Sequence, residues 1–145
     1  MFKHVLIATD GSELAQKAVT HGLALAKALA AKVTAVTVTD IYPTGPYAPI
    51  PLPAIVEHYE AAAELAAANI LSSVSDAARK AGISCATIHV KDQAPAEGIL
   101  EAAGQSGCDL IVVASHGRRG MVRLLLGSQA QKVVTLSTLP VLICR

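Results

Sequence analysis

The sequence predicts an α/β fold, a doubly wound parallel sheet of five strands with helices on both faces. The main observation is that short apolar runs rich in β-branched residues alternate with segments of helical period five times along the 145 residues. In addition, the runs LIVV at 110–113 and VLI at 141–143 are apolar at every position, which is typical of strands buried on both faces. The length fits one domain, residues 1–145, and 52% hydrophobic residues can supply its core.

The first part of the chain contains two strands, a helix between them and a proline-rich loop. The run HVLIAT at 4–9 is the first strand, and the DGS turn at 10–12 supplies N-cap chemistry for a helix at 13–31. The alternating run VTAVTV at 33–38 is the second strand. Five prolines at 41–53 remove backbone donors, so we expect a long surface loop there.

The second part begins with an alanine-rich segment at 54–81, which predicts a helix that Gly82 terminates. At 1.5 Å per residue this helix would be roughly 40 Å long, so we expect it to project beyond the sheet. The remaining elements are expected as a strand at 84–90, a helix at 95–106 with Pro95 in its first turn, a strand at 109–115, a helix at 127–136 and a strand at 140–144.

Composition excludes several classes of function. Only 16% of the residues are charged and the net charge is +1, so the chain has no broad positive field for nucleic acid or an anionic membrane. No apolar run approaches the roughly 20 residues of a membrane span. The three cysteines lie in or beside apolar runs and, like the histidines, lack metal-ligand spacing. We therefore expect a cytoplasmic protein with reduced thiols, no protein-bound metal cluster, and no nucleic-acid or membrane partner.

Residues that could bind a ligand follow the first strand and the strand at 109–115. Open parallel sheets bind ligands beyond the carboxyl ends of strands, where the strand order reverses. In the second of these loops, Gly127 and Ser128 stand where a helix begins, and its amides can hold a phosphate. The alternative is that the glycines only turn the chain and Ser128 only caps the helix. Positive charge is added in the same loop by Arg118, Arg119 and Arg123.

Two further side chains have the same ambiguity. Asp10 either satisfies the first amides of the following helix or contacts a ligand, because an Asp-Gly-Ser sequence at a strand-to-helix junction serves both purposes. His116 is either a loop histidine held by a backbone bond or a ligand contact, and its position beside Gly117 favours the ligand.

Over nearly its whole length the chain resembles the universal stress protein family. The resemblance begins with VLIATDGSELAQKAV and is strongest at DLIVVASHGRRGMVRLLLGSQAQKVV followed by LPVLICR. The nucleotide-binding branch of that family has Gly, two residues, Gly, nine residues, then Gly-Ser or Gly-Thr. Here Gly117 and Gly127-Ser128 match this spacing, whereas Ala114 occupies the position of the first glycine.

This resemblance implies the strand order 3-2-1-4-5 of adenine nucleotide alpha hydrolase-like folds, with ATP lying across the crevice between strands one and four. Asp10 would face the nucleotide or a bound Mg²⁺, and Val38 would meet the adenine through its backbone. A Cβ at Ala114 would occupy space beside the ligand and weaken binding without abolishing it. The nucleotide-binding residues implied are Ala8, Thr9, Asp10, Val38, Val113, Ala114, His116, Gly117, Gly127, Ser128, Gln129 and Ala130.

The function implied is a stress sensor or regulator that binds ATP and hydrolyses it slowly or not at all. No Walker lysine and no pair of nucleophile and base stand near the loop, so no catalytic residue is expected and any ATPase activity should be weak. The alternative is a nucleotide-independent homodimeric interaction module with a degenerate glycine loop. Both readings include a homodimer, because the strand at 140–144 should be a sheet edge at which this family commonly dimerises.

Overall fold

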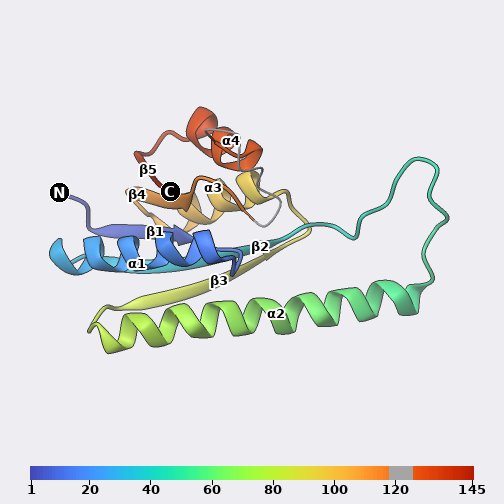
Figure 1. Cartoon of the computed structure of the whole chain (residues 1–145), viewed down its shortest axis with the longest axis horizontal. Helices are drawn as coiled ribbons and strands as arrows, with labels where there is room; N and C mark the ends of the chain where they lie inside the picture. The colour runs from blue at the N-terminus through green and yellow to red at the C-terminus, as the bar shows by residue number, and fades with distance from the viewer. Residues whose placement is uncertain (118–125) are drawn as a thin grey trace.

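The computed structural model describes residues 1–117 and 126–145 and contains a parallel sheet between two layers of helices (Figure 1). Each pair of neighbouring strands is parallel, and the sheet order is β3-β2-β1-β4-β5, which confirms the expected order. The order therefore reverses between β1 and β4. The strands are β1 (His4–Ala8), β2 (Lys32–Thr39), β3 (Cys85–Lys91), β4 (Leu110–Ala114) and β5 (Val141–Cys144).

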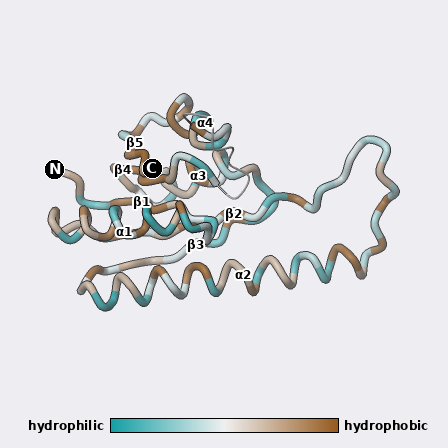
Figure 2. The backbone as a smooth tube through the Cα atoms, in the orientation of Figure 1, coloured by the Kyte–Doolittle hydropathy of each residue, from teal (hydrophilic) through white to brown (hydrophobic). Residues whose placement is uncertain are grey.

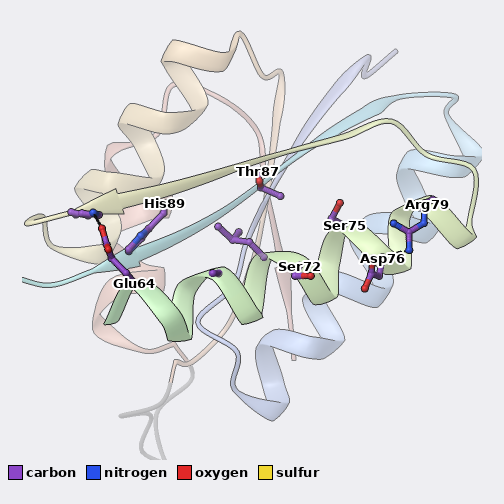
Figure 3. Close-up of a pocket in the computed structure, with 10 residues that line it drawn as sticks. Glu64, Ser72, Ser75, Asp76, Arg79, Thr87 and His89 are labelled. Carbon is purple, nitrogen blue, oxygen red and sulfur yellow. Dashed lines mark hydrogen bonds and ion pairs between the residues drawn. The ribbon is translucent and has the colours of Figure 1, made fainter. Parts of the chain in front are cut away.

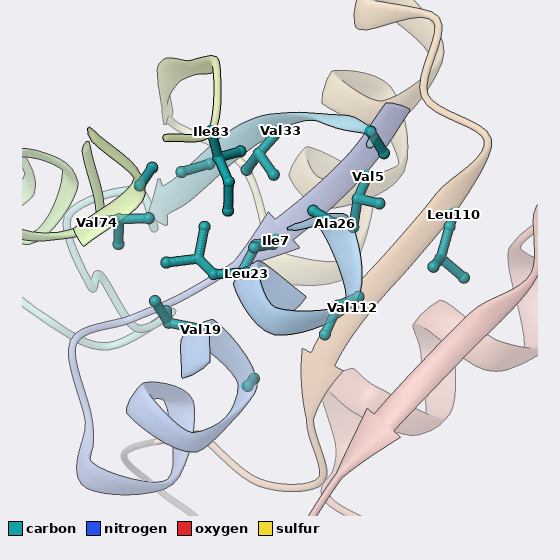
Figure 4. Packing of buried hydrophobic residues seen from close by; sticks show 14 of the residues in the cluster. Val5, Ile7, Val19, Leu23, Ala26, Val33, Val74, Ile83, Leu110 and Val112 are labelled. Carbon is teal, nitrogen blue, oxygen red and sulfur yellow. The ribbon is translucent and has the colours of Figure 1, made fainter. Parts of the chain in front are cut away.

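Two helices cover each face of the sheet. Because side chains alternate along a strand, Val5 and Ile7 of β1 face one helix pair while Leu6 faces the other. The first face packs against α1 and α2, as Figure 4 shows for Leu23 and Val74, and the second packs against α3 and α4. The helices are α1 (Glu13–Ala28), α2 (Pro53–Lys80), α3 (Pro95–Ser106) and α4 (Ser128–Leu136).

Helix α1 begins where the sequence predicts and ends earlier. The Ser12 Oγ accepts a hydrogen bond from the Ala15 amide at 3.2 Å, so Ser12 is the N-cap. The helix ends at Ala28 and not at Ala31, because Ala30 adopts a left-handed conformation with φ 53°. The Ala31 amide then bonds the Ala26 carbonyl at 2.8 Å and directs the chain into β2.

Helix α2 extends well past the sheet at the end where it begins (Figure 1). Its buried residues start only at Ala67, so the turns before that position do not pack on the core. The proline-rich segment before α2 forms the expected exposed loop, in which apolar residues such as Tyr47 and Ile50 are exposed to solvent. Figure 2 shows this loop standing away from the rest of the chain. Within the described residues no helix has the length and apolarity required to cross a membrane.

Candidate functional site

Asp10 lies at the carboxyl end of β1, in the turn that starts α1. The Thr9 amide continues the sheet by bonding the Val36 carbonyl at 3.0 Å, and the Thr9 Oγ1 accepts from the Gly11 amide at 3.1 Å. The Asp10 Oδ1 accepts from the Ser12 amide at 2.9 Å. One oxygen of the Asp10 carboxylate therefore supports the turn before the helix, while Ser12 and not Asp10 caps the helical amide of Ala15.

The second oxygen of Asp10 faces the glycine loop that follows β4. A Cβ added to Gly117 would lie 2.9 Å from the Asp10 Oδ2, closer than real Cβ contacts allow. A side chain at this position would therefore require the Asp10 carboxylate to shift. The fold thus joins the two residues, which are far apart in the sequence, at the point where the strand order reverses.

The loop closes on itself through Ser115, His116 and Gly127. The Gly127 amide donates to the Ser115 carbonyl at 2.7 Å, and a Cβ on Gly127 would lie 3.2 Å from that oxygen and 3.5 Å from the His116 Cδ2. The His116 Nδ1 is 3.1 Å from the Ser115 Oγ. The His116 Nε2 is buried and has no hydrogen-bond partner within residues 1–117 and 126–145. A buried ring nitrogen without a partner among the described residues is unusual, and this one lies beside two glycines.

This serine and histidine pair differs from the expectation that no nucleophile and base stand near the loop. The hydroxyl of Ser115 is nevertheless enclosed, because the residue is 3% exposed and its amide bonds the Cys144 carbonyl at 2.7 Å. A nucleophile must reach the reacting atom of a substrate. Ser115 therefore orients the imidazole of His116 and is poorly placed to attack a ligand itself.

Helix α4 starts at Ser128 with amides directed to the loop. Its N-cap, Gly127, has no side chain to satisfy them, and the first intrahelical bond runs from the Gln131 amide to the Gly127 carbonyl at 2.9 Å. The preceding amides, those of Ser128, Gln129 and Ala130, lack intrahelical acceptors. They form the positive end of the helix dipole, which favours an anion.

The side chain of Gln129 is engaged elsewhere. Its Oε1 accepts from the Ala96 amide, in the first turn of α3, at 3.0 Å. A role of this residue toward phosphate would therefore use its backbone amide. Ala130 is buried beneath the helix start, at 7% exposure.

Val38 lies on β2, beyond the point where β1 ends. The β1–β2 ladder stops at the pair Ala8 and Val36. Because a strand directs its peptide groups alternately to its two neighbours, the N–H and C=O of Val38 face the same side as those of Val36. These groups are therefore positioned beside the crevice, as a backbone contact to adenine requires, while the side chain packs towards α3.

The remaining predicted residues lie at the carboxyl ends of β1 and β4. Ala8 and Val113 are buried with side chains on the face of α3 and α4, and Thr9 is buried at the end of β1. Ala114 is in regular strand pairing with Cys144, and its side chain packs against the core on the opposite face. It is not among the described non-glycine residues with positive φ, so its backbone carries no left-handed strain.

Part of the predicted site lies outside the described residues, namely Gly120, Arg118, Arg119 and Arg123. In the rest of the chain, no group of three or more histidine, cysteine, aspartate or glutamate side chains is arranged to hold a metal ion. A Mg²⁺ at this site would therefore depend on Asp10 together with ligand oxygens.

Sequence reasoning missed two features. One is a hollow of about 740 Å³ between α2 and the edge strand β3, lined by Ser72, Ser75 and Thr87 among others (Figure 3). Its charged groups are already paired, Arg79 with Asp76 at 2.8 Å and Lys91 with Glu64. It lies two strands away from β1, so it is separate from the crevice.

The second missed feature is Gly98, in the interior of α3. A Cβ there would lie 2.8 Å from the Val38 Cγ2. A glycine inside a helical pattern often marks a close approach, and this signal was available in the sequence.

Comparisons with known proteins agree with this fold. The sequence model of the universal stress protein family matches residues 1–145. Universal stress protein YxiE of Bacillus subtilis is 33% identical over 152 residues, covering 100% of both chains. The solved structure of hypothetical protein MJ0577 superimposes with a TM-score of 0.83 at 26% identity, covering 99% of this chain and 96% of that one.

A further solved structure, a universal stress protein in complex with cAMP, has a TM-score of 0.69 at 27% identity and covers 99% of this chain and 97% of its own. The family match spans every residue and YxiE is aligned from end to end. The chain therefore belongs to the universal stress protein family.

Proposed function

We propose that this protein binds ATP in the crevice between the carboxyl ends of β1 and β4 and acts as a stress-response sensor or regulator. The observation that carries the proposal is the contact between Gly117 and Asp10, where an added Cβ would lie 2.9 Å from the carboxylate. Among the described residues, a helix start without a side-chain cap and a histidine nitrogen without a hydrogen-bond partner lie in the same loop region. Glycine at this position leaves space beside the Asp10 carboxylate, where a Mg²⁺ that also binds a phosphate chain would fit.

Each part of the crevice has a proposed role toward the nucleotide. The amides of Ser128, Gln129 and Ala130 would hold phosphate oxygens, with Gly117 and Gly127 allowing close approach. The His116 Nε2 would bond the phosphate or ribose, and Asp10 would bind the ribose or a Mg²⁺. The backbone of Val38 would meet the adenine, above a floor of Ala8, Thr9, Val113 and Ala114.

The solved relative in complex with cAMP supports the adenine nucleotide as the ligand class. That structure is 27% identical and covers 99% of this chain. The choice of a triphosphate rests on the spacing of Gly117 and Gly127-Ser128, which resembles that of the nucleotide-binding branch of the family.

Hydrolysis should be slow or absent. Within the described residues the serine nearest the loop is enclosed, and the amides of the helix start bind phosphate in the ground state as well as in the transition state. Uniform binding of this kind does not accelerate a reaction. Turnover should therefore fall far below the roughly 10 s⁻¹ of a typical enzyme.

We also propose that the protein is a homodimer joined through β5. This strand is a sheet edge, with Leu142 exposed and Val134 and Leu136 exposed on neighbouring α4. Two copies of the edge can pair antiparallel about a two-fold axis. Leu142→Asp should halve the mass measured by light scattering, whereas Leu65→Asp on projecting α2 should leave it unchanged; a wild-type monomer at micromolar concentration contradicts the dimer.

The three described cysteines, Cys85, Cys108 and Cys144, are unpaired thiols, and burial raises the pKa of Cys108 to about 11. Such thiols are protonated and unreactive at neutral pH. They suit the reducing cytoplasm that we propose as the location.

The proposed ligand is tested by calorimetric titration with ATP, ADP, AMP and cAMP, each with and without Mg²⁺. We expect saturable binding of adenine nucleotides, with ATP tightest. Absence of heat and of any thermal shift at millimolar nucleotide contradicts the proposal and favours the nucleotide-independent homodimeric module.

A further inference from the structure

The first turn of α3 touches both ends of the proposed nucleotide site. This helix has Ala94 as its N-cap, with no side-chain hydrogen bond of its own, and Pro95 in its first turn. Ala96 and Gly98 follow within one turn, and each contacts a different wall of the crevice. The helix therefore bridges elements that the sheet order keeps apart.

The contact with the phosphate end runs through Gln129. The Ala96 amide can only donate, so the atom that meets it at 3.0 Å must be the carbonyl oxygen of the Gln129 side chain. This bond supplies the missing cap of α3 from the second residue of α4. It ties the start of α4, which carries the phosphate-binding amides, to the start of α3.

The contact with the adenine end runs through Gly98. A Cβ on Gly98 would lie 2.8 and 2.9 Å from the two methyl carbons of Val38 and 3.2 Å from a methyl of Val90. Because Gly98 has no side chain, α3 rests directly on Val38. The position of α3 therefore determines where β2 ends relative to the helix layer.

We propose that Gln129 and Gly98 are positioning residues for the adenine nucleotide: through the first turn of α3 they set the distance between the α4 amides and the Val38 backbone. The inference rests on the proposed function. Helix α3 thus fixes the spacing between the phosphate half and the adenine half of the site, although α3 itself contributes none of the proposed ligand contacts.

This arrangement has a measurable consequence. A ligand that spans both walls needs the correct spacing, whereas a ligand that occupies one wall does not. Misplacement by about 1 Å is costly for groups that must act together. Loss of the Gln129 bond should therefore weaken whole-nucleotide binding more than binding of either half.

The experiment compares ATP, adenosine and tripolyphosphate by calorimetry on Gln129→Ala and on its matched control Gln131→Ala, an exposed glutamine on the same helix. We expect Gln129→Ala to reduce ATP affinity roughly tenfold, which is the effect of about one lost hydrogen bond. The affinities for adenosine and for tripolyphosphate should each fall less than about twofold, because neither ligand contacts both walls of the site. Gln131→Ala should match the wild type for all three.

A second pair of variants tests the other contact. Gly98→Ala should displace Val38 and weaken ATP and adenosine while leaving tripolyphosphate unchanged. Gly104→Ala lies on the same helix, where an added Cβ meets nothing within 4 Å, and should leave all three affinities unchanged.

Hydrogen exchange of the Ala96 amide reports the Gln129 bond without any nucleotide. Exchange should accelerate in Gln129→Ala and remain slow in Gln131→Ala and in Gln129→Glu, which retains an acceptor oxygen.

Unchanged exchange of the Ala96 amide in Gln129→Ala overturns the inference. An equal loss of ATP and tripolyphosphate affinity also overturns it, because that result would show that Gln129 only stabilises α4. Failure of the wild type to bind any adenine nucleotide overturns the proposed function, whereas wild-type ATP affinity in Gln129→Ala overturns only the positioning role.

Discussion

Two histidines at opposite ends of the sheet have the same local bonding and different surroundings. At the amino end the His4 Nε2 meets the Thr34 Oγ1 at 2.8 Å, and at the carboxyl end the His116 Nδ1 meets the Ser115 Oγ at 3.1 Å. In each ring the other nitrogen is buried without a hydrogen-bond partner among the described residues. The bonding of the ring alone therefore does not distinguish a structural histidine from a ligand contact.

The difference lies in the backbone around each ring. At the amino end the Asp109 carboxylate accepts from the Lys3 amide at 2.8 Å and the His4 amide at 3.0 Å, so the amides there are used within the chain. At the carboxyl end glycines leave room, and within the part of the chain that the structure describes the start of α4 has no side-chain cap. The proposal that this end binds the nucleotide therefore rests on space and on available donors more than on a polar side chain.

The largest effect is expected from Gly117→Val. The added side chain would meet the Asp10 carboxylate and fill the crevice, so ATP affinity should fall by roughly tenfold or more in calorimetry. Gly104→Val, on an open face of α3, is the matched control and should retain the wild-type affinity. Equal affinities in both variants would remove the carboxyl end as the binding site.

The converse substitution is Asp109→Ala at the amino end. Two amides lose their acceptor, one of them partly buried, so the free energy of unfolding should fall by about 1–3 kcal/mol. Nucleotide affinity should not change. Urea denaturation and calorimetry measure the two quantities, with exposed Asp40→Ala as the control; a loss of affinity without a loss of stability would reverse the assignment of the two ends.

A smaller effect is expected at Ala114, where the family motif has glycine. Its side chain packs into the core on the face of α1, and its backbone is an ordinary strand conformation. Ala114→Gly should therefore lower the free energy of unfolding by about 0.5–1 kcal/mol and leave ATP affinity within roughly twofold. A marked gain in affinity would show instead that the methyl group obstructs the ligand.

The smallest expected signal is the pH dependence due to His4. Burial, and then the nearby Lys32 charge, lower the pKa of His4 below its ordinary 6.5. The unfolded state then binds more protons, so this contribution to stability is complete above about pH 6.5 and is lost as the pH falls below it.

Urea midpoints at about pH 7.5 and pH 5.5 measure this dependence. The decrease at the lower pH should be smaller in His4→Gln than in the wild type, while His21→Gln, on the exposed face of α1, should retain the wild-type decrease. An identical decrease in His4→Gln would assign the acid sensitivity to other groups.

Local patterns were sufficient for the elements, whereas the approach of Asp10 to Gly117 also required the strand order. The alternation of strand and helix periods predicts the doubly wound sheet, and the DGS turn predicts the Ser12 cap. The family resemblance supplied the strand order, which brings Asp10 beside Gly117.

Tertiary contacts account for what sequence reasoning could not supply. The bond from Ala96 to Gln129 joins two helix starts 33 residues apart and depends on how α3 and α4 pack. The hollow beside α2 likewise depends on the tilt of a long helix over an edge strand. The early end of α1 reflects a left-handed alanine, a conformation that residue type does not favour.

The comparison between the two ends of the sheet is tested most directly by a backbone amide NMR titration of the wild type with ATP, because one spectrum reports both ends. We predict shift changes at the amides of Gly11, Gly117 and the first turn of α4, with none at His4 or Asp109. Absence of shifts at saturating ATP, or shifts confined to the amino end or to the hollow around Ser72 and Arg79, would contradict the account.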